Sequence, residues 1–269
     1  MGRDRILKIV VIGPGRAGGS LALAARRSNH EIVGVLSRGA VGRFGPALSW
    51  DLPIPECDLL LIAVRDDAIT AVAERIAPLC ANVRVAAHVS GFTPVTALEP
   101  LSMHDVAIGG FHPLQTLPDP ERGAAALPGS YVGVGGDGPA TTLLVEFAGT
   151  LGLRPFLLAD GARPAYHAAA AAASNFVITS LATAGELFES AEIDPSVARP
   201  LVERAVANFF ESWPEVPLTG PIARGDIETV RGHLESANAV SQQVGRSFRL
   251  LSEATANLAG RDEEVAEWS

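Results

Sequence analysis

The stretch that decides the fold is Val10-Val11-Ile12-Gly13-Pro14-Gly15-Arg16-Ala17-Gly18-Gly19-Ser20, near the start of the 269-residue chain. It places the pattern G-x-G-x-x-G directly after an apolar, strand-like run and at the start of a helical pattern. Gly13 allows a tight turn, Gly15 lets the backbone approach a pyrophosphate, and Gly18 lets the helix pack closely on the sheet. The N–H groups at the start of the helix, from Arg16 and Ala17 onward, then face the phosphates. We therefore expect a dinucleotide-binding unit rather than a simple glycine-rich turn.

Short apolar runs alternate with helical patterns on both sides of this unit. The runs are rich in Val and Ile and apolar on both faces, as expected of buried parallel strands. We expect strands at residues 7–12, 31–36, 58–64, 83–89, 106–110 and 131–134, and helices at 18–27, 67–79 and 139–151. This alternation indicates an α/β fold with a doubly wound, Rossmann-type sheet. A second glycine cluster, Gly133–Gly138, is expected to be only a strand end and a turn, because Asp137 has the wrong charge to face a phosphate.

The pattern changes near residue 160, after which we find no strand-like run. Helices are expected at residues 164–190, 195–212, 226–237 and 240–258. Six consecutive alanines, Ala168–Ala173, would let another backbone approach closely, so we expect this helix to be central and buried. The sequence therefore predicts a dinucleotide-binding Rossmann-like domain at 1–160 and an all-α second domain at 161–269, which we expect to serve substrate binding and dimerisation.

The composition excludes several classes of protein. Hydrophobic residues make up 48% of the chain, which is enough for a packed core. The formal net charge of -9 argues against nucleic-acid or anionic-membrane partners, which need clustered Lys and Arg. Cys57 and Cys80 have no metal-ligand spacing, so we expect no metal and a reduced, cytoplasmic protein. Uninterrupted apolar runs such as residues 59–64 are far shorter than the roughly 20 residues of a membrane span.

Lys8 is the only lysine in the chain, so the other 20 of the 21 basic residues are arginines. The simplest explanation is the codon bias of a GC-rich genome. Whatever the origin of this bias, its chemical consequence is the same. Lys8 is the only lysine that could donate a proton or form a Schiff base.

The end of the second predicted strand indicates which dinucleotide binds. An NAD enzyme usually has an acidic residue there to bind the ribose 2′-hydroxyl, whereas this chain has Leu36-Ser37-Arg38. A hydroxyl and a guanidinium suit the 2′-phosphate of NADP. The alternative is that Arg38 is a surface arginine that contacts only solvent. Ala63 and Val64, at the end of the third strand, are expected to run beside the cofactor.

Two other strands end in polar residues within apolar surroundings. In a parallel sheet, the residues that bind ligands lie at such carboxyl ends of the strands. In His88-Val89-Ser90-Gly91, the Ser90 hydroxyl and the Gly91 N–H are candidates for binding a substrate carboxylate. In Phe111-His112-Pro113-Leu114-Gln115-Thr116, His112 titrates in a useful range and Gln115 can orient a carbonyl. A purely structural histidine is the alternative for His112, and we expect a structural role for His30, His104 and His233.

The long helix and a later loop add three candidates. Tyr166, His167, Ser174 and Asn175 interrupt the alanines, and His167 and Ser174 are seven residues apart on one face. A buried Asn175 needs several hydrogen-bond partners, of which a substrate is one candidate. In the polar loop at residues 219–226, Arg224 is a candidate for holding a carboxylate, and Asp226 is expected to cap the next helix.

These motifs together resemble one family, a Rossmann-like NAD(P)-binding domain followed by a C-terminal helical domain of unknown function numbered 2520. The resemblance runs from about Lys8 to about Leu258. It rests on the glycine motif with Ser37-Arg38, His88-Val89-Ser90-Gly91, His112-Pro113-Leu114-Gln115-Thr116, Ala165-Tyr166-His167, Ala173-Ser174-Asn175-Phe176 and residues 218–226.

The resemblance implies an oxidoreductase without a settled substrate. The family is similar in architecture to pyrroline-5-carboxylate reductases, prephenate dehydrogenases and β-hydroxyacid dehydrogenases, which are mostly dimers joined through the helical domain. Some members have been proposed as an alternative kind of ketopantoate reductase. β-Hydroxyacid dehydrogenases and ordinary ketopantoate reductases carry a lysine on the long helix, whereas this chain has His167 and Asn175 in that region.

We therefore expect an NADPH-dependent reductase of a small oxo- or imino-acid, with 2-ketopantoate as the leading single substrate. His112 or His167 would donate the proton and Asn175 would hydrogen-bond the reacting oxygen. Ser90, Gly91 and Arg224 would hold the substrate carboxylate. The alternatives are a non-catalytic NADP(H)-binding sensor or scaffold and a hydride transfer involving a deazaflavin. The elongated, apolar second domain predicts a homodimer.

Overall fold

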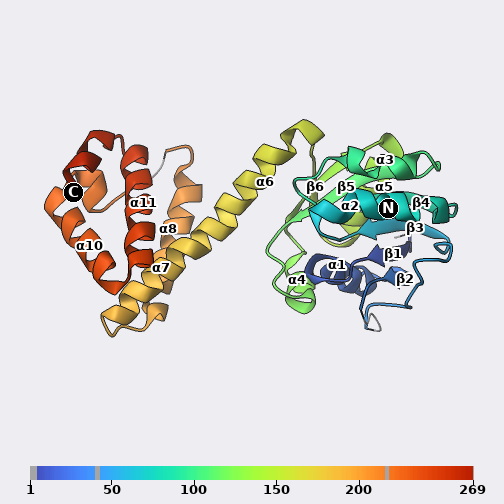
Figure 1. Cartoon of the computed structure of the whole chain (residues 1–269), viewed down its shortest axis with the longest axis horizontal. Helices are drawn as coiled ribbons and strands as arrows, with labels where there is room; N and C mark the ends of the chain where they lie inside the picture. The colour runs from blue at the N-terminus through green and yellow to red at the C-terminus, as the bar shows by residue number, and fades with distance from the viewer. Residues whose placement is uncertain (1–4, 40–42, 216–217, 269) are drawn as a thin grey trace. The chain divides into compact units, whose positions relative to one another are not determined.

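The computed structural model describes residues 5–39, 43–215 and 218–268 (Figure 1). The chain divides into two compact units, Met1–Ala171 and Ala172–Ser269. The first unit thus extends eleven residues past residue 160, where the sequence pattern changes. The physical reason is Arg163, whose side chain is fully buried within the first unit and ties the following helical turns to it.

The first unit is built on one seven-stranded sheet with the order β2-β1-β3-β4-β5-β6-β7. All neighbouring strands are parallel except β5 and β6. The fold class predicted from the sequence, a doubly wound Rossmann-type domain followed by helices, is confirmed. The strands are β1 Lys8–Ile12, β2 Glu31–Leu36, β3 Cys57–Ile62, β4 Val83–His88, β5 Ala107–Leu114, β6 Tyr131–Gly136 and β7 Arg154–Leu157.

The direction of β6 corrects the expectation that all of the strands are parallel. Leu114, the last residue of β5, lies opposite Tyr131, the first residue of β6, so the two strands are antiparallel. The connection between them does not cross the sheet. Its helix α4, Pro120–Ala126, packs against α1 instead, and Gly123 there leaves room for the Ser20 side chain. Strand β7, which the sequence pattern did not reveal, is short and lies at the sheet's edge.

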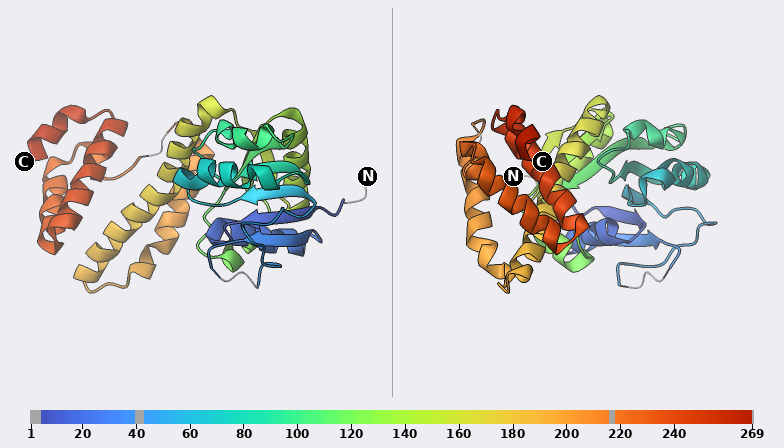
Figure 2. Two further views of the ribbon diagram at one scale, coloured as in Figure 1. Left: turned by 45° about the vertical axis from the view of Figure 1, so that its right-hand side comes forward. Right: turned by 60° about the vertical axis from the view of Figure 1, so that its left-hand side comes forward.

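Helices cover both faces of the sheet, as the two views in Figure 2 also show. Alternate residues of β3 face opposite cores: Leu59 and Leu61 belong to one, Leu60 and Ile62 to the other, and all four are fully buried. The first core contains α1 Arg16–Arg27, α4 and α5 Gly138–Thr150. The second contains α2 Ile69–Ile76 with its flanking 3-10 turns, and then η3 Val95–Leu98 and α3 Glu99–Ser102.

The second glycine cluster is a strand end and a turn, as predicted. Strand β6 ends at Gly136, whose φ of 137° lies in a region that suits glycine. Asp137 then caps α5, because its carboxylate accepts a hydrogen bond from the Ala140 N–H at 2.9 Å. Its other carboxylate oxygen accepts one from the Ile108 N–H at 2.9 Å, which joins the start of α5 to β5.

All regular secondary structure in the described part of the second unit is helical. A small core of Val230, Leu234, Ala256 and Trp268 holds its last helices together. The elements of this unit are η5 Ala172–Phe176, a π-helical turn, followed by α7 Val177–Ser190, η6 Pro195–Ala198, α8 Arg199–Ser212, α9 Pro221–Arg224, α10 Ile227–Val240, α11 Gln242–Leu258 and η7 Asp262–Trp268.

The alanine-rich helix is not buried within its own chain, contrary to expectation. Helical structure runs from Asp160 to Ser190, and this stretch is long and apolar enough to cross a membrane by length and composition alone. Only 6% of its most apolar window is buried, and four of the six residues Ala168–Ala173 are exposed. The helix therefore presents an apolar surface that this chain does not itself cover.

Candidate functional site

The glycine loop lies at the carboxyl end of β1, between β2 and β3, where the strand order of the sheet reverses. Ligands of open α/β sheets bind at such a switch point. Gly13 has a φ of 82°, and its N–H donates to the Leu36 carbonyl at 2.9 Å. A Cβ on Gly13 would lie 2.6 Å from the Ala63 oxygen, and one on Gly18 would overlap the Gly13 oxygen. The turn and the close packing assigned to these two glycines are therefore present.

Gly15 differs from its neighbours because a Cβ there would meet no atom within 4 Å. Helix α1 begins at the next residue, Arg16, and no side chain caps it. Its first turn also carries no acidic residue. The open side of Gly15 and the uncapped N–H groups of Arg16 and Ala17 therefore leave this helix start accessible, as anion binding at a helix N-terminus requires. Val64 borders the same turn, with its Cγ1 3.1 Å from the position of a Gly13 Cβ.

Ser37 and Arg38 follow β2, as the sequence predicts. Ser37 is tied into the loop, since its hydroxyl accepts from the Gly39 N–H at 3.1 Å. Arg38 is exposed and forms no ion pair within the described residues, and residues 40–42 lie outside them. The nearby Arg43 is engaged with Glu121 at 2.8 Å. Arg38 is therefore the guanidinium at this strand end that remains available to a phosphate.

A cluster of two histidines and a tyrosine lies at the carboxyl end of β5. His88, the last residue of β4, pairs with Gly110, so His112 extends two residues beyond the neighbouring strand. His112 Nδ1 is 2.7 Å from the Tyr166 hydroxyl oxygen. The rings of His112 and His167 are 5.8 Å apart. The structure thus brings together His112 and His167, which the sequence predicted as catalytic. It adds Tyr166, which lies on helix α6, Arg163–Ala171, and contacts His112 at the end of β5.

Gly91 lies against this cluster. A Cβ on Gly91 would be 2.7 Å from His167 Nδ1 and 2.9 Å from His112 Nε2. Gly91 itself is buried, while the neighbouring Phe92 is 52% exposed and packs edge-on against the His167 ring. Only a residue without a side chain allows the loop after β4 to approach both imidazoles.

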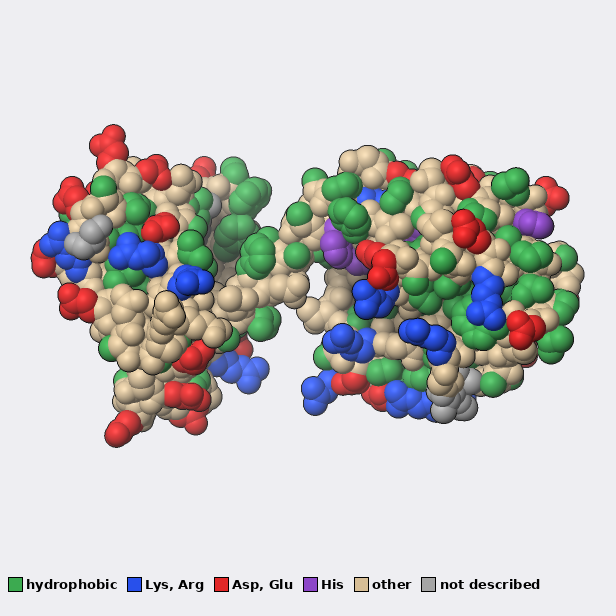
Figure 3. Space-filling model, in the orientation of Figure 1, with side chains coloured by type: hydrophobic (Ala, Val, Ile, Leu, Met, Phe, Trp, Pro, Cys, Tyr) green, Lys and Arg blue, Asp and Glu red, His purple; other side chains and the backbone are tan. Residues whose placement is uncertain are grey.

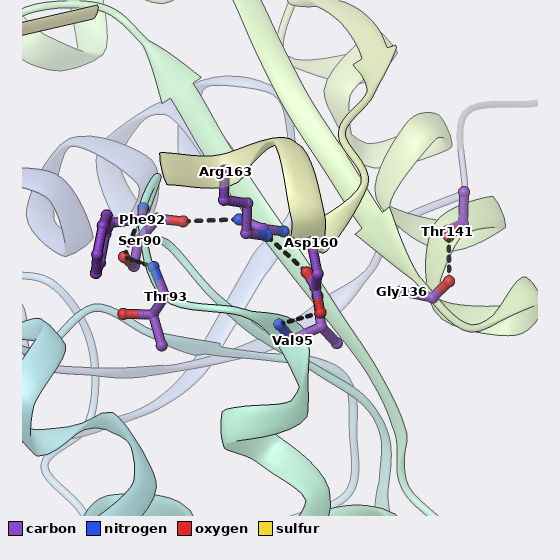
Figure 4. Close-up of polar contacts among 8 residues, drawn as sticks. All are labelled: Ser90, Phe92, Thr93, Val95, Gly136, Thr141, Asp160 and Arg163. Atoms are coloured by element: carbon purple, nitrogen blue, oxygen red, sulfur yellow. Dashed lines mark hydrogen bonds and ion pairs between the residues drawn. The ribbon is translucent and has the colours of Figure 1, made fainter. Parts of the chain in front are cut away.

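A buried ion pair fixes the loop and the helix relative to each other (Figure 4). Arg163 is 0% exposed, and its Nε donates to Asp160 at 2.7 Å while its Nη1 donates to the Ser90 carbonyl at 3.1 Å. The other Asp160 carboxylate oxygen accepts from the Val95 N–H at 2.9 Å. Gly110, on β5, leaves the room that the guanidinium occupies. The sequence analysis missed this pair, and its only signal was an arginine three residues after an aspartate at a helix start.

Ser90 and Gln115 serve local structure in the described chain. The Ser90 hydroxyl oxygen accepts from the N–H groups of Phe92 and Thr93 at 3.1 and 2.9 Å, and its own hydrogen remains available to a ligand. Gln115 donates to the Ser130 hydroxyl at 2.9 Å and accepts from the Thr116 N–H at 2.8 Å. Gln115 is thus committed to the α4–β6 connection and is not brought to the histidine cluster.

Asn175 and Arg224 both lie in the second unit. Asn175 is exposed in the π-helical turn, and its backbone carbonyl accepts from the Thr179 hydroxyl at 3.0 Å. The expectation of a buried asparagine is therefore wrong for the single chain, because nothing in this unit covers that turn. Arg224 is exposed at the end of α9. Asp226 caps α10 as predicted, accepting from the Thr229 N–H at 3.3 Å.

Burial keeps His112, His88 and Tyr166 uncharged at neutral pH. It lowers the pKa of His112 to about 4, and electrostatic interactions with His167 and Arg163 act in the same direction. The pKa of the fully buried His88 is also lowered to about 4, first by burial and then by Arg163. Burial raises the pKa of Tyr166 to about 12. The Tyr166–His112 pair is thus a neutral phenol beside a neutral imidazole.

The comparisons with known proteins agree with this architecture. The family model described as "Domain of unknown function (DUF2520)" matches residues 130–255, which confirms the resemblance over that part of the chain. A "putative NADP oxidoreductase" from Bacteroides fragilis is 24% identical with a TM-score of 0.80, covering 94% of this chain and 98% of that one. No curated protein sequence matches.

Two further solved structures share the fold at lower identity. The pyrroline carboxylate reductase of Plasmodium falciparum, solved with NADP bound, is 14% identical with a TM-score of 0.64 and covers 96% of this chain and 100% of its own. An imine reductase of Streptomyces aurantiacus is 16% identical with a TM-score of 0.67, covering 97% of this chain and 98% of its own. At these identities the likeness shows the fold.

The buried histidines predict a loss of stability in acid. Unfolding raises the pKa of His88 from about 4 toward the ordinary histidine value of 6.5, so the unfolded chain binds more protons between these values. The stabilisation is therefore present above pH 6.5 and is lost as the pH falls toward 4, by about 3 kcal/mol for this group. Urea denaturation across this range should show a shallower loss in His88→Gln than in the wild type. The exposed His104→Gln is the control, and equal slopes in all three proteins would contradict the prediction.

Proposed function

We propose that this protein is an NADP(H)-dependent oxidoreductase that reduces the C=O or C=N bond of a small oxo- or imino-acid. The observation that carries the proposal is the placement of two features at one edge of the sheet. The glycine loop follows β1, and the His112–Tyr166–His167 cluster and Gly91 follow β5 and β4. Asp66, four residues after the end of β3, is close enough to raise the pKa of His112 against the lowering effects, which supports their proximity.

The residues at the switch point fit a dinucleotide with a 2′-phosphate. Gly13, Gly15 and the first N–H groups of α1 would hold the pyrophosphate, and Ala63 and Val64 would line the path of the cofactor. The exposed Arg38 guanidinium and the Ser37 hydroxyl would bind the 2′-phosphate. When bound, the cofactor supplies the hydride that the reduction requires.

The chain's own groups would orient the substrate and supply the proton. His112, a neutral imidazole, would donate a hydrogen bond from Nε2 to the reacting atom and release that proton to it. Within the first unit, the Gly91 N–H and the Ser90 hydroxyl would bind the carboxylate. Arg163 is not a carboxylate ligand in this proposal, because it is fully buried and paired with Asp160. 2-Ketopantoate is the leading single substrate.

The direct test is NADPH oxidation by the full chain with a panel of 2-oxo acids and cyclic imines. At least one compound should be turned over, and His112→Ala should lower kcat by about 10²- to 10⁴-fold, the usual contribution of a positioned acid or base. His104→Ala, an exposed histidine, is the matched control and should keep the wild-type rate. Tight NADPH binding without turnover of any compound would refute the proposal and favour the non-catalytic sensor.

The choice of NADPH over NADH can be tested separately at Arg38. In Arg38→Asp, a carboxylate would repel the 2′-phosphate and the charge-assisted contact would be lost. We expect Kd for NADPH to rise by about ten- to a hundredfold, as the loss of one such contact implies, with little change for NADH. Fluorescence titration with both cofactors measures this. Arg65→Asp, an exposed arginine paired with Asp67, is the control, and an unchanged NADPH/NADH ratio in Arg38→Asp would count against NADP.

We further propose that two copies of the chain form a homodimer through the second unit. The support is a set of large apolar side chains that this unit leaves exposed, and Figure 3 shows apolar side chains gathered on this unit's visible face. The most exposed of these side chains are Phe176, Ile178, Leu201, Phe210 and Trp213, each at least 64% exposed. Apolar patches of this kind mark an interface rather than a solvated surface.

Light scattering on a size-exclusion column should give twice the chain mass of 28.0 kDa. The double variant Leu201→Glu/Phe210→Glu places two charges on α8 and should shift the protein to monomer. The matched control is Leu52→Glu, a similarly exposed leucine of the first unit at 62%. A monomeric wild type at micromolar concentration would overturn the dimer.

A further inference from the structure

Strand β2 forms one edge of the sheet, and a later segment of the chain covers its outer side. Residues 46–48 run parallel to β2 there. The Val35 N–H donates to the Pro46 carbonyl at 2.8 Å, and the Leu48 N–H donates to the Val35 carbonyl at 2.9 Å. We call residues 44–50 the edge segment. Because Ser37 and Arg38 directly follow β2, the edge segment borders the proposed 2′-phosphate site.

Close packing holds the edge segment against the sheet and against α1. Gly34 on β2 leaves room for the Leu48 side chain, since a Cβ on Gly34 would overlap it. Phe44 is buried, and its ring would be 2.9 Å from a Cβ on Gly19 of α1. These contacts and the backbone pairing with β2 do not involve Trp50. The edge segment should therefore keep its position when Trp50 is replaced.

Trp50, at the end of the edge segment, holds the peptide group between Ser37 and Arg38. Its indole Nε1–H donates to the Ser37 carbonyl at 3.3 Å. The ring is half-buried and packs against the core that contains Leu36. The Arg75 guanidinium, on α2, lies over the ring, 4.9 Å from its centre. The indole is thus held between the core and a guanidinium, and its hydrogen bond fixes the Ser37 carbonyl.

The orientation of this peptide group determines where the Arg38 N–H points. The peptide is trans, so its N–H lies on the side opposite the Ser37 carbonyl and points away from the indole. Within the described residues the Arg38 N–H has no hydrogen-bond partner. The Ser37 hydroxyl accepts from the Gly39 N–H at 3.1 Å, and its own hydrogen remains available. One dipeptide therefore presents two polar hydrogens and an exposed guanidinium, which together suit a phosphate dianion.

We propose that Trp50 is a positioning residue for NADP. Its indole N–H orients the Ser37–Arg38 peptide so that the Ser37 hydroxyl and the N–H and guanidinium of Arg38 meet the 2′-phosphate together. This inference rests on the proposed function, which assigns the 2′-phosphate to Ser37 and Arg38, and adds a residue that acts through them. NADH has no 2′-phosphate, so its binding depends little on this orientation. Trp50 thus sets the preference for NADPH over NADH rather than the affinity for dinucleotides in general.

The first test removes the indole N–H and keeps an aromatic ring. In Trp50→Phe, we expect Kd for NADPH to rise about two- to tenfold, as the loss of one neutral hydrogen bond implies, with Kd for NADH unchanged. Titration of the full chain, followed by the fluorescence of the reduced nicotinamide, measures both constants. Tyr131→Phe is the matched control, because it removes one polar hydrogen from a half-exposed ring on β6, far from β2 in the sheet. An unchanged NADPH/NADH ratio in Trp50→Phe, or an equal loss for both cofactors, would overturn the positioning role.

A double variant tests whether Trp50 acts through Arg38. Arg38→Ala removes the guanidinium, which is one of the groups that the indole positions. Trp50→Phe should therefore raise Kd for NADPH by a smaller factor in the Arg38→Ala background than in the wild type. Equal factors in the two backgrounds would show that the two residues act independently, and would overturn the inference.

The indole also reports on the site directly. The chain has three tryptophans, and Trp50 is the one in the first unit. In the ¹⁵N-labelled full chain, its indole N–H resonance is assigned by its absence in Trp50→Phe. This resonance should shift further on saturation with 2′,5′-ADP than with 5′-AMP, because the two nucleotides differ only in the 2′-phosphate. Equal shifts would overturn the link between the indole and the 2′-phosphate.

The outcomes separate this inference from the function on which it rests. A wild type that binds NADH at least as tightly as NADPH would refute the proposed cofactor, and the inference with it. A wild type that prefers NADPH, with the same preference in Trp50→Phe, would overturn only the role of Trp50. A protein that reduces none of the tested compounds would refute the proposed reaction, and the two binding constants would still decide the role of Trp50.

Discussion

The site depends on one buried ion pair, between Arg163 and Asp160. A guanidinium at 0% exposure is expensive to desolvate, so it needs an opposite charge and hydrogen-bond acceptors around it. Here Asp160 supplies the opposite charge and the Ser90 carbonyl supplies a further acceptor, while Nη2 of Arg163 is buried without a hydrogen-bond partner among the described residues. Asp160 in turn binds the Val95 N–H. The pair therefore joins the start of α6 to both ends of the loop that follows β4.

This junction explains why residues from three distant parts of the sequence meet. His112 stands at the end of β5, where it extends past β4. Gly91 comes from the loop that Arg163 holds, and Tyr166 and His167 come one helical turn after Arg163 on α6. Gly110 is part of the same arrangement, because a side chain there would displace the guanidinium. The residues of this site are thus positioned mainly by packing around one charged group, the Arg163 guanidinium.

Local patterns predicted the parts of the fold that local physics controls. The glycine motif, the β2 strand and the cap at Asp226 each follow from a few neighbouring residues, and the structure agrees with them. The antiparallel direction of β6 could not be read from the sequence, because the residues of a buried strand look the same in either direction. The prediction that the alanine run is buried was wrong for a related reason. The sequence of an apolar helix indicates that something covers it, but it does not indicate whether the covering residues belong to the same chain.

In the candidate site, too, the sequence predicted some features and left others undetermined. The types of the important residues were visible as polar interruptions in apolar runs, which is how His112, Gly91 and His167 were found. Their partners were not visible, because hydrogen-bond pairing is a property of three-dimensional contacts. Gln115 looked as available as His112, yet its amide is bound to Ser130 and Thr116. Arg163 looked like an ordinary helix-start residue, yet it is the most buried charge in the described chain.

The near absence of lysine has a physical counterpart in this site. A lysine brings a positive charge that attracts a substrate carboxylate and stabilises a developing oxyanion. In this chain, burial raises the pKa of Tyr166 and lowers that of His112, so a single cause makes both groups neutral. Arg163 is cancelled by Asp160. His112 and Tyr166 therefore offer hydrogen bonds without net charge, and in the proposed function the backbone N–H of Gly91, rather than a lysine, would meet the substrate carboxylate.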